Sequence, residues 1–424
     1  MNTMASKTKA TANPALTILD GGSITSPRGF RAGAVYCGLK SAGAGKLDLA
    51  ILQAEAPCVA AGVFTTNRLC AAPVQLCKRR LAQLAQAQAV IVNAGIANAG
   101  TGQQGLDTAE KMTELAARKL GIQPEMALVA STGKIGWQIP LAKIEAGVAQ
   151  ITPTEHGGHD MARAMMTTDT RPKEIAVRFT LPAGRGAGEA ATVTVAGVAK
   201  GAGMIHPDMA TMIALVTTDA AVDPAFLRQA LKRAADCTFN MISIDGDMST
   251  NDTLIALANG YAGNEPVRQG TAAARRFQKA LDAVCQYLAK AIARDGEGAT
   301  RLVEVTVRGA VSLDDARRAA RTITTSNLTK CAIHGADPNW GRIAAAAGRS
   351  GALMDQTRLD VAVGDVWLMR NGTPLEYDVA RARALLSGET VPIIVDFHLG
   401  LSEATAWGCD MSEEYVTFNS DYTT

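Results

Sequence analysis

The sequence predicts an α/β protein that holds two domains or one unusually large one. Short apolar runs of strand length recur along the 424 residues, and longer segments with apolar residues at helical spacing lie between them. A chain of this length buries a substantial core. Because aromatic residues make up only 4% of it, we expect that core to consist of aliphatic side chains.

The first half of the chain alternates between the two patterns. Strands are expected at residues 47–52, 59–64, 89–92, 126–130 and 174–180. The polar cluster at 65–74 is expected to be a loop, and residues 182–191 (PAGRGAGEAA) a long hairpin loop. Helices are expected from about residue 107, where Met112, Leu115 and Leu120 share one face, at 141–148, and up to residue 166.

The second half continues in the same way. Asp223-Pro224 is a typical helix start, and residues 271–293 carry a long apolar stripe through Phe277, Leu281 and Leu288. Alternation at 303–307 predicts a strand, followed by a helix near 314–322, an Ala-rich helix after 335–342 and a strand at 391–397. No assignment is made for the tail from residue 415.

Composition excludes several function classes. Lys and Arg number 42 against 40 Asp and Glu, without a dense basic block, so we expect no nucleic-acid partner. The amino-terminal residues lack an apolar signal core and no 18-residue apolar run occurs, so we expect neither secretion nor a membrane partner. Eight scattered cysteines without a C-x-x-C pair favour reduced, mostly buried thiols in a cytoplasmic protein.

One glycine motif raises a dinucleotide-binding alternative. Gly100, Gly102 and Gly105 satisfy G-x-G-x-x-G. However, they fall well after the preceding strand ends, and Glu125, the acidic residue at the expected distance, precedes the following strand instead of ending it. A non-catalytic nicotinamide-binding protein is thus an alternative of another class, and it predicts one intact chain.

Two further motifs suggest metals and do not satisfy the templates. His156 and His159 have no visible third ligand, so a polar surface loop is favoured. The run 245–253, DGDMSTNDT, resembles a calcium loop but has Thr250 where the template requires glycine and Ala256 where it requires glutamate. We interpret this run as a tightly hydrogen-bonded turn near the site and expect no metal and no cofactor.

The stretch at residues 193–220 carries the main catalytic hypothesis. Two apolar runs flank a bend that contains Pro207, and the second run starts at Thr211, after the small Ala210. Self-cleavage before Thr211 would free an α-amino group with a pKa of about 8, able to act as base for its own hydroxyl. The alternative is an ordinary hairpin in which Thr211 only favours strand geometry.

A second catalytic hypothesis concerns residues 131–136, STGKIG. Small polar residues at a strand's carboxyl end expose a hydroxyl and a backbone N–H, the two components of an oxyanion hole. A capping turn before the helix at 141–148 is the other interpretation.

Taken together, these stretches resemble the ornithine acetyltransferase family, the self-cleaving, ArgJ-type glutamate N-acetyltransferases of arginine biosynthesis. The matching motifs follow one another along nearly the whole chain: TTNRLCAAPV, NAGIANAGTGQQG, STGKIG, MTTDT, KGAGMIHPDMATM, DGDMSTNDT, RDGEGAT, DPNWGR, WGCD and NSDYTT. The resemblance implies a layered α/β sandwich related to the N-terminal nucleophile hydrolases, with a second, smaller α/β domain.

The resemblance also implies a set of site residues. Cleavage between Ala210 and Thr211 would give an alpha chain, residues 1–210, and a beta chain, residues 211–424. Thr211 would be the nucleophile, and Thr132 and Gly133 the oxyanion hole. The implied substrate contacts are Thr167 or Thr168, which the sequence does not separate, with Lys200, Thr211, Glu297, Asn419 and Thr424.

The implied reaction moves an acetyl group from N2-acetyl-L-ornithine to L-glutamate through an acetyl-threonine. The resemblance leaves open whether acetyl-CoA is a further donor, which would make the enzyme bifunctional. It also implies a heterotetramer of two alpha and two beta chains. An alternative on the same scaffold is an amidohydrolase or aminopeptidase, which would pass the acyl group to water.

Overall fold

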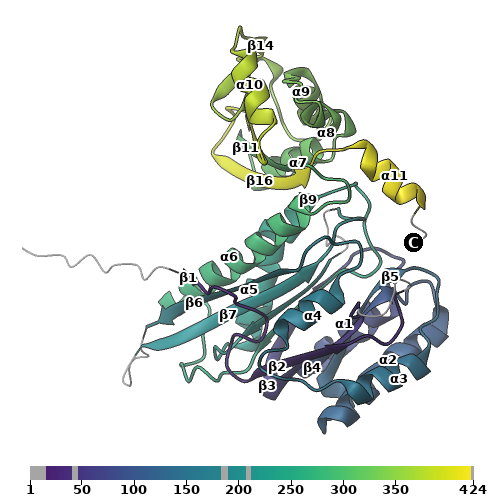
Figure 1. The fold of residues 1–424 in the computed structure, drawn as a ribbon. Helices are drawn as coiled ribbons and strands as arrows, with labels where there is room; N and C mark the ends of the chain where they lie inside the picture. Colours follow the sequence, from purple (N-terminus) through teal and green to yellow (C-terminus); the bar gives the residue numbers. More distant parts are fainter. Residues whose placement is uncertain (1–15, 41–45, 183–189, 207–211, 422–424) are drawn as a thin grey trace, which may run out of the picture.

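The computed structural model describes residues 16–40, 46–182, 190–206 and 212–421. They form two lobes, each built on its own sheet, with the second lobe above the first in Figure 1. The α/β prediction is confirmed, and so is the second, smaller α/β domain.

The first lobe holds a nine-stranded sheet in the order β1-β6-β7-β8-β10-β3-β4-β5, with β2 paired to β3. Pairs β8–β10 and β4–β5 are parallel, and the other neighbours are antiparallel. Its strands are β1 (Thr17–Ile18), β2 (Phe30–Val35), β3 (Leu49–Phe64), β4 (Gln86–Ile96), β5 (Ala127–Lys134), β6 (Lys173–Leu181), β7 (Ala191–Lys200), β8 (Ile213–Thr218) and β10 (Thr253–Ala258).

Helices cover both faces of this sheet because its strands are apolar on both sides. Along β8, Ala214 and Val216 pack with α5 (Pro224–Cys237) and α6 (Ala272–Arg294). Ile213 and Leu215 belong to the opposite core. That core is closed by α1 (Ala72–Gln83), α2 (Gly102–Leu120), α3 (Leu141–Gln150) and α4 (Gly158–Met165). The result is a helix–sheet–helix sandwich.

The second lobe holds a seven-stranded sheet in the order β14-β13-β12-β15-β11-β16-β9. Its strands are β9 (Ile242–Ser243), β11 (Leu302–Ala310), β12 (Asp360–Val363), β13 (Val366–Arg370), β14 (Thr373–Pro374), β15 (Thr390–Asp396) and β16 (Ser402–Cys409). Its helices are α7 (Leu313–Thr324), α8 (Asn327–His334), α9 (Trp340–Gly348), α10 (Val379–Leu386) and α11 (Glu413–Asp421). Short 3-10 turns lie at Pro124–Met126, Phe239–Met241 and Gln356–Arg358.

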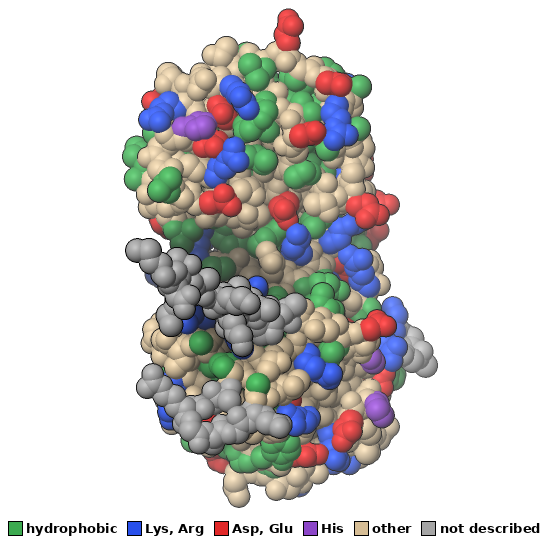
Figure 2. Space-filling view, turned by 90° about the vertical axis from the view of Figure 1, so that its left-hand side faces the viewer, with side chains coloured by type: hydrophobic (Ala, Val, Ile, Leu, Met, Phe, Trp, Pro, Cys, Tyr) green, Lys and Arg blue, Asp and Glu red, His purple; other side chains and the backbone are tan. Residues whose placement is uncertain are grey.

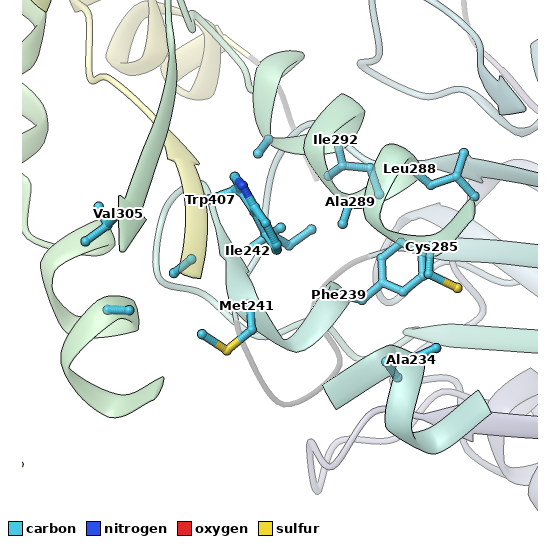
Figure 3. Close-up of a cluster of buried hydrophobic side chains, with 14 of the residues drawn as sticks. Ala234, Phe239, Met241, Ile242, Cys285, Leu288, Ala289, Ile292, Val305 and Trp407 are labelled. Atoms are coloured by element: carbon cyan, nitrogen blue, oxygen red, sulfur yellow. The ribbon is translucent and has the colours of Figure 1, made fainter. Parts of the chain in front are cut away.

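The two lobes share one apolar core where they meet. Figure 3 shows Phe239 and Met241, from the turn after α5, with Leu288 and Ile292 of α6 and Trp407 of β16 in the same cluster. Burial of aliphatic surface stabilises by about 25 cal/mol per Å². A junction of this composition therefore holds α6, and the loop after it, in a fixed place relative to both sheets.

Two sequence predictions, of a break in one strand and of a loop, are wrong. The strands expected at 47–52 and 59–64 are one strand, β3, because the interruption around Pro57 is taken up by a register shift between Gln53 and Cys58. Helix α1 begins inside the expected loop at 65–74. The tail, for which no element was predicted, is helical from Glu413, in α11.

Helix α2 begins at Gly102, not near residue 107, so Gly102 and Gly105 lie in its first turn. A Cβ at Gly105 would overlap the Thr101 hydroxyl, so this glycine serves close packing of the helix start. The run lies between β4 and α2 of a unit whose strands β4 and β5 are parallel. The fingerprint is nevertheless incomplete, because Glu125 lies in the 3-10 turn before β5 and not at the end of that strand.

The expected division into residues 1–210 and 211–424 would split the first sheet. Strands β8 and β10, which follow residue 211, lie between β7 and β3, which precede it. Two chains divided there would therefore remain interleaved through the central strands of one sheet.

Candidate active site

One cavity lies between the lobes and takes its walls from both of them. First-lobe strands and loops supply most of the lining, and the second lobe supplies the loop after α6 and part of α11. The lining residues are Ala97, Thr132, Gly133, Ile135, Thr167, Thr168, Lys200, Gly203, Met204, Asp245, Asp247, Ser249, Thr250, Asn251, Glu297, Tyr415 and Asn419.

The inner wall is formed where parallel strands β4 and β5 end. Gly95 and Gly133 are register partners there, and the register shifts directly after Gly95. Gly133 has a φ of 124°, and a Cβ on it would overlap the carbonyl of Gly95. Only glycine fits this approach. The backbone of Gly133 can therefore line the cavity next to Thr132, with no side chain in between.

Thr132 is held by a buried cation. The Nζ of Lys200, the last residue of β7, lies 3.2 Å from the Oγ1 of Thr132, and both residues are buried. An ammonium group can only donate, so Thr132 accepts this bond and its own hydroxyl proton points elsewhere. The geometry suits a hydroxyl that donates to a developing negative charge. Thr132 lies inside β5, so the capping-turn interpretation is wrong.

A buried ion cluster supports Lys200 from behind. Lys173 Nζ lies 2.5 Å from a carboxylate oxygen of Asp169 and 2.5 Å from one of Asp295. Asp169 also accepts the backbone N–H groups of Thr167 and Gly201, so it fixes both segments that flank Lys200 in the cavity wall.

The cluster also sets the charge states of these groups. Burial alone would raise the pKa of Asp169, but Lys173 and Lys200 beside it lower that pKa to about 2. Burial lowers the pKa of Lys200, against the opposing effect of Asp169. Asp169 is therefore ionised, and its negative charge lies close to Lys200 in the cavity wall.

The outer wall is formed by Glu297 and Asn419. The Glu297 N–H donates to the carbonyl of Ala202 at 2.8 Å, and a Cβ at Gly203 would lie 2.5 Å from the Glu297 carboxylate. Glycine at 203 thus makes room for that acid. Asn419, on α11, donates from Nδ2 to Glu297 Oε2 at 3.0 Å. Glu297 is half-buried and Asn419 exposed, so this wall is wetter than the inner one.

Asp245 also lines the cavity and is not among the predicted site residues. It accepts the backbone N–H groups of Met204 and Ile205, and burial raises its pKa to about 6. The sequence run 245–253 carried the signal, because its short polar residues predicted a hydrogen-bonded turn. That prediction is confirmed. Tyr415 also lines the cavity, and nothing in the sequence pattern indicated it.

Seven of the predicted site residues therefore lie around one cavity: Thr132, Gly133, Thr167, Thr168, Lys200, Glu297 and Asn419. Both threonines of the 167–168 pair line it, so both stay open as substrate contacts. Ala210, Thr211 and Thr424 lie outside the described residues. The roles assigned to all of these residues remain predictions.

The described residues contain no group of three or more His, Cys, Asp or Glu side chains arranged to hold a metal ion. His159 lies in α4, with its Nδ1 2.8 Å from Glu174 Oε1. All eight cysteines are unpaired, although only four of them are fully buried.

In the part of the chain that is described, no helix has both the length and the apolar character to cross a membrane. On the face shown in Figure 2, basic and acidic side chains are intermixed over both lobes instead of gathered by sign. That face therefore offers no basic stripe of the kind that binds nucleic acid.

The chain is similar to known proteins over nearly its whole length. The model of the ArgJ family matches residues 31–424. Proteins called "Arginine biosynthesis bifunctional protein ArgJ" from Dehalococcoides mccartyi and Symbiobacterium thermophilum are 50% and 51% identical to it. They cover 96% and 95% of this chain, which in turn covers 99% of each.

Two solved structures carry related names. One is an arginine biosynthesis bifunctional protein argJ from Bacillus halodurans, 43% identical, with a TM-score of 0.48; it spans 49% of this chain and 98% of its own. The other is an ornithine acetyltransferase from Mycobacterium tuberculosis complexed with ornithine, 36% identical, with a TM-score of 0.40. It spans 47% of this chain and 100% of its own.

Proposed function

This chain belongs to the ArgJ family and is an acyltransferase of arginine biosynthesis, and from that premise we propose its reaction. The proposal is that it transfers the acetyl group of N2-acetyl-L-ornithine to L-glutamate through an ester on Thr211. The observation that carries the proposal is the pairing of Thr132 with the buried Lys200 beside Gly133, which matches what an acyl-transfer oxyanion requires.

The first half-reaction loads the enzyme. The Thr211 hydroxyl oxygen attacks the acetyl carbonyl carbon, and the α-amino group of Thr211 takes the hydroxyl proton. Negative charge collects on the carbonyl oxygen, where the Thr132 hydroxyl and the Gly133 N–H donate to it. One such donor is worth about 3 to 4 kcal/mol. The carbon–nitrogen bond then breaks, ornithine leaves with the proton, and an acetyl ester remains.

The second half-reaction unloads it. The α-amine of glutamate attacks the ester carbonyl, the same two donors hold the oxyanion, and the threonine oxygen leaves and regains a proton. Glu297 supplies a negative charge for the ammonium of ornithine, and Lys200 a positive charge for a substrate carboxylate. Water must be kept from the ester, since otherwise the donor would merely be hydrolysed. No metal or cofactor is needed for either step.

The nucleophile requires self-cleavage between Ala210 and Thr211, which would leave chains of 210 and 214 residues. The sheet supports this proposal because β7 and β8 pair antiparallel, Lys200 opposite Ile213. The connection that contains the proposed cleavage point therefore leaves from Lys200 in the cavity wall and returns to the strand beside it. Interleaving in one sheet would keep the two chains together, and we propose a heterotetramer of two alpha and two beta chains.

Acetyl-CoA is proposed as a second donor, in keeping with the word bifunctional in the relatives' names. It would acylate Thr211 by the same attack, with the thiolate of CoA as the leaving group. The eight unpaired cysteines fit the proposed location in the cytoplasm.

Mass spectrometry of the denatured protein tests the proposal. We expect two fragments that meet at Ala210/Thr211 in the wild type and one intact chain in Thr211→Ala. An intact wild-type chain with full activity would contradict the N-terminal amine mechanism. Product analysis with labelled acetylornithine then separates the alternatives: acetylglutamate supports the transferase, whereas free acetate indicates an amidohydrolase.

A further inference from the structure

The polar turn before β10 contacts two parts of the proposed active site, the strand ends beside the oxyanion hole and the backbone that follows the nucleophile. Asn251 is buried, and its Nδ2 donates to two backbone carbonyls, those of Ala97 at 2.6 Å and Ser131 at 2.8 Å. Its Oδ1 accepts from the Thr250 hydroxyl. The amide nitrogen faces two carbonyl oxygens and the amide oxygen faces a hydroxyl donor, so only one of the two flipped orientations of the Asn251 amide satisfies all three bonds.

These two carbonyls belong to the inner wall of the cavity. The Ser131 carbonyl is part of the planar peptide unit that joins Ser131 to Thr132, so a bond to it fixes the start of Thr132. Ala97 follows the irregular end of β4 that packs on Gly133. Asn251 thus ties together the two strand ends that present the oxyanion donors.

The next residue holds the other partner in the reaction. Asp252 is fully buried, and its Oδ1 accepts the backbone N–H of Met212 at 3.1 Å. The Met212 carbonyl accepts the N–H of Thr253 at 3.0 Å. The Met212 nitrogen shares a planar peptide unit with the carbonyl of residue 211, so the Asp252 carboxylate restrains the chain where the nucleophile is attached.

The turn itself is anchored on the far side. The Thr65 hydroxyl donates to the Ser249 carbonyl at 2.8 Å, and the Thr65 N–H donates to the Asp252 carbonyl at 3.1 Å. The Ala71 N–H donates to the Thr250 carbonyl at 3.0 Å. The turn is therefore anchored to the segment between β3 and α1.

From this arrangement we infer that Asn251 and Asp252 are positioning residues that set the spacing between the nucleophile and the oxyanion hole. Adjacent Cα atoms lie about 3.8 Å apart across a planar peptide. The distance between the Cα atoms of Asn251 and Asp252 is therefore fixed by the single peptide unit that joins them. Neither side chain is assigned a role in bond making. The inference rests on the proposed function, since it presumes that residue 211 and the Thr132–Gly133 pair act together.

Asn251→Asp tests the first half of the inference. It keeps the shape of the side chain but replaces two donors by an oxygen that faces carbonyl oxygens. A displacement of about 1 Å in an active site can cost about 100-fold in rate. We expect kcat for acetyl transfer to fall about 100-fold, with KM for acetylornithine within about threefold of wild type. Asn251→Ala, which places no charge there, is the second variant in case the first does not fold.

Asp252 is tested by a loss and a rescue. Asp252→Ala removes the acceptor of the Met212 N–H, and we expect slower self-cleavage and a kcat reduced about 100-fold. Asp252→Asn retains an oxygen at the same place. The amide oxygen can still accept the Met212 N–H, so the amide is a close replacement. We expect Asp252→Asn to restore cleavage and kcat to within about tenfold of wild type.

Asn264→Asp is the matched control. The Nδ2 of Asn264 also donates to two carbonyls, those of Ala221 and Glu265, and its Oδ1 accepts the Ala221 N–H. It lies beyond the carboxyl end of β10, away from the cavity. Variants at 251 and 252 that match this control in kcat would overturn the inference. A wild type that cleaves itself but forms no acetylglutamate would contradict the proposed function instead.

Discussion

The two walls of the cavity differ in burial, and the difference indicates a division of labour. On the inner wall, Thr132 and Lys200 are 4% and 3% exposed and are backed by the ion cluster of Asp169, Lys173 and Asp295. On the outer wall, Glu297 is half-buried and Asn419 is exposed. Electrostatic interactions are stronger where water is excluded. We therefore expect the inner wall to govern the chemical step and the outer wall to govern substrate affinity.

The largest expected effect is the loss of stability on changing the ion cluster behind the inner wall. Asp169→Asn removes a buried carboxylate from Lys173, and breaking a buried pair costs about 3 to 5 kcal/mol. We expect the free energy of unfolding, measured with urea at pH 7, to decrease by an amount near the lower end of that range, because Asp295 still pairs with Lys173.

The pH dependence of the same variant supplies its check. The pKa of Asp169 is lowered from 3.8 to about 2 in the fold, so the folded state binds fewer protons than the unfolded state between those values. Its stabilisation is therefore present above about pH 4 and is lost as the pH falls through 2. As the pH falls from about 4 to 2, the free energy of unfolding should decrease less in Asp169→Asn than in wild type. An equal decrease would show that Asp169 does not stabilise the fold through its charge.

The next effect concerns the chemical step itself. Thr132→Val keeps the shape of the side chain and removes the hydroxyl, so we expect kcat to fall about 100- to 1,000-fold with little change in KM. Thr306→Val is the control, because the Thr306 hydroxyl lies in the second lobe, where it bonds to the hydroxyl of Thr405. Wild-type kcat in Thr132→Val would show that Thr132 is not an oxyanion donor.

A smaller effect is expected on the outer wall. Glu297→Gln removes the charge that would hold the ornithine ammonium, and a bond to a charged group is worth about 1.5 to 3 kcal/mol. We expect KM for acetylornithine to rise about 10- to 100-fold, with a much smaller change in kcat. Glu403→Gln, at an exposed position in β16, is the control. A loss confined to kcat would erase the distinction between the walls.

The smallest effect is expected at Asn419. Its Nδ2 supports the Glu297 carboxylate from an exposed position, where water competes for the bond, and exposed contacts of a charged group contribute about 1 kcal/mol or less. We expect Asn419→Ala to raise KM by about fivefold at most in steady-state assays. A larger rise than in Glu297→Gln would mean that Asn419 contacts substrate directly and does not act through Glu297.

The inner wall was more accessible to prediction from sequence than the outer wall. Thr132, Gly133 and Lys200 lie at or near strand ends, and apolar runs identify strands well. The approach of Gly133 to Gly95 depends on which strands are neighbours, and periodicity carries no such information. The Asn251 bonds show the same limit, since their carbonyl partners lie 120 and 154 residues away along the chain.

The outer wall depends on packing between two segments that lie far apart in the sequence. Tyr415 and Asn419 reach the cavity only because α11 lies against the loop after α6, where the Ser412 hydroxyl donates to the Gly298 carbonyl at 2.6 Å. The motif resemblance pointed to Asn419 and Glu297, while nothing pointed to Tyr415. The interruption at Pro57 gave the opposite error, a predicted break inside one continuous strand.

The most direct test of the account is to find where the acetyl group rests. The purified enzyme would be incubated with labelled acetylornithine without glutamate, quenched in acid and digested for peptide mass spectrometry. We predict label on the hydroxyl of Thr211 alone, and its transfer to glutamate when that acceptor is added before the quench. Label on any other side chain, or label that glutamate does not remove, would contradict the central claim.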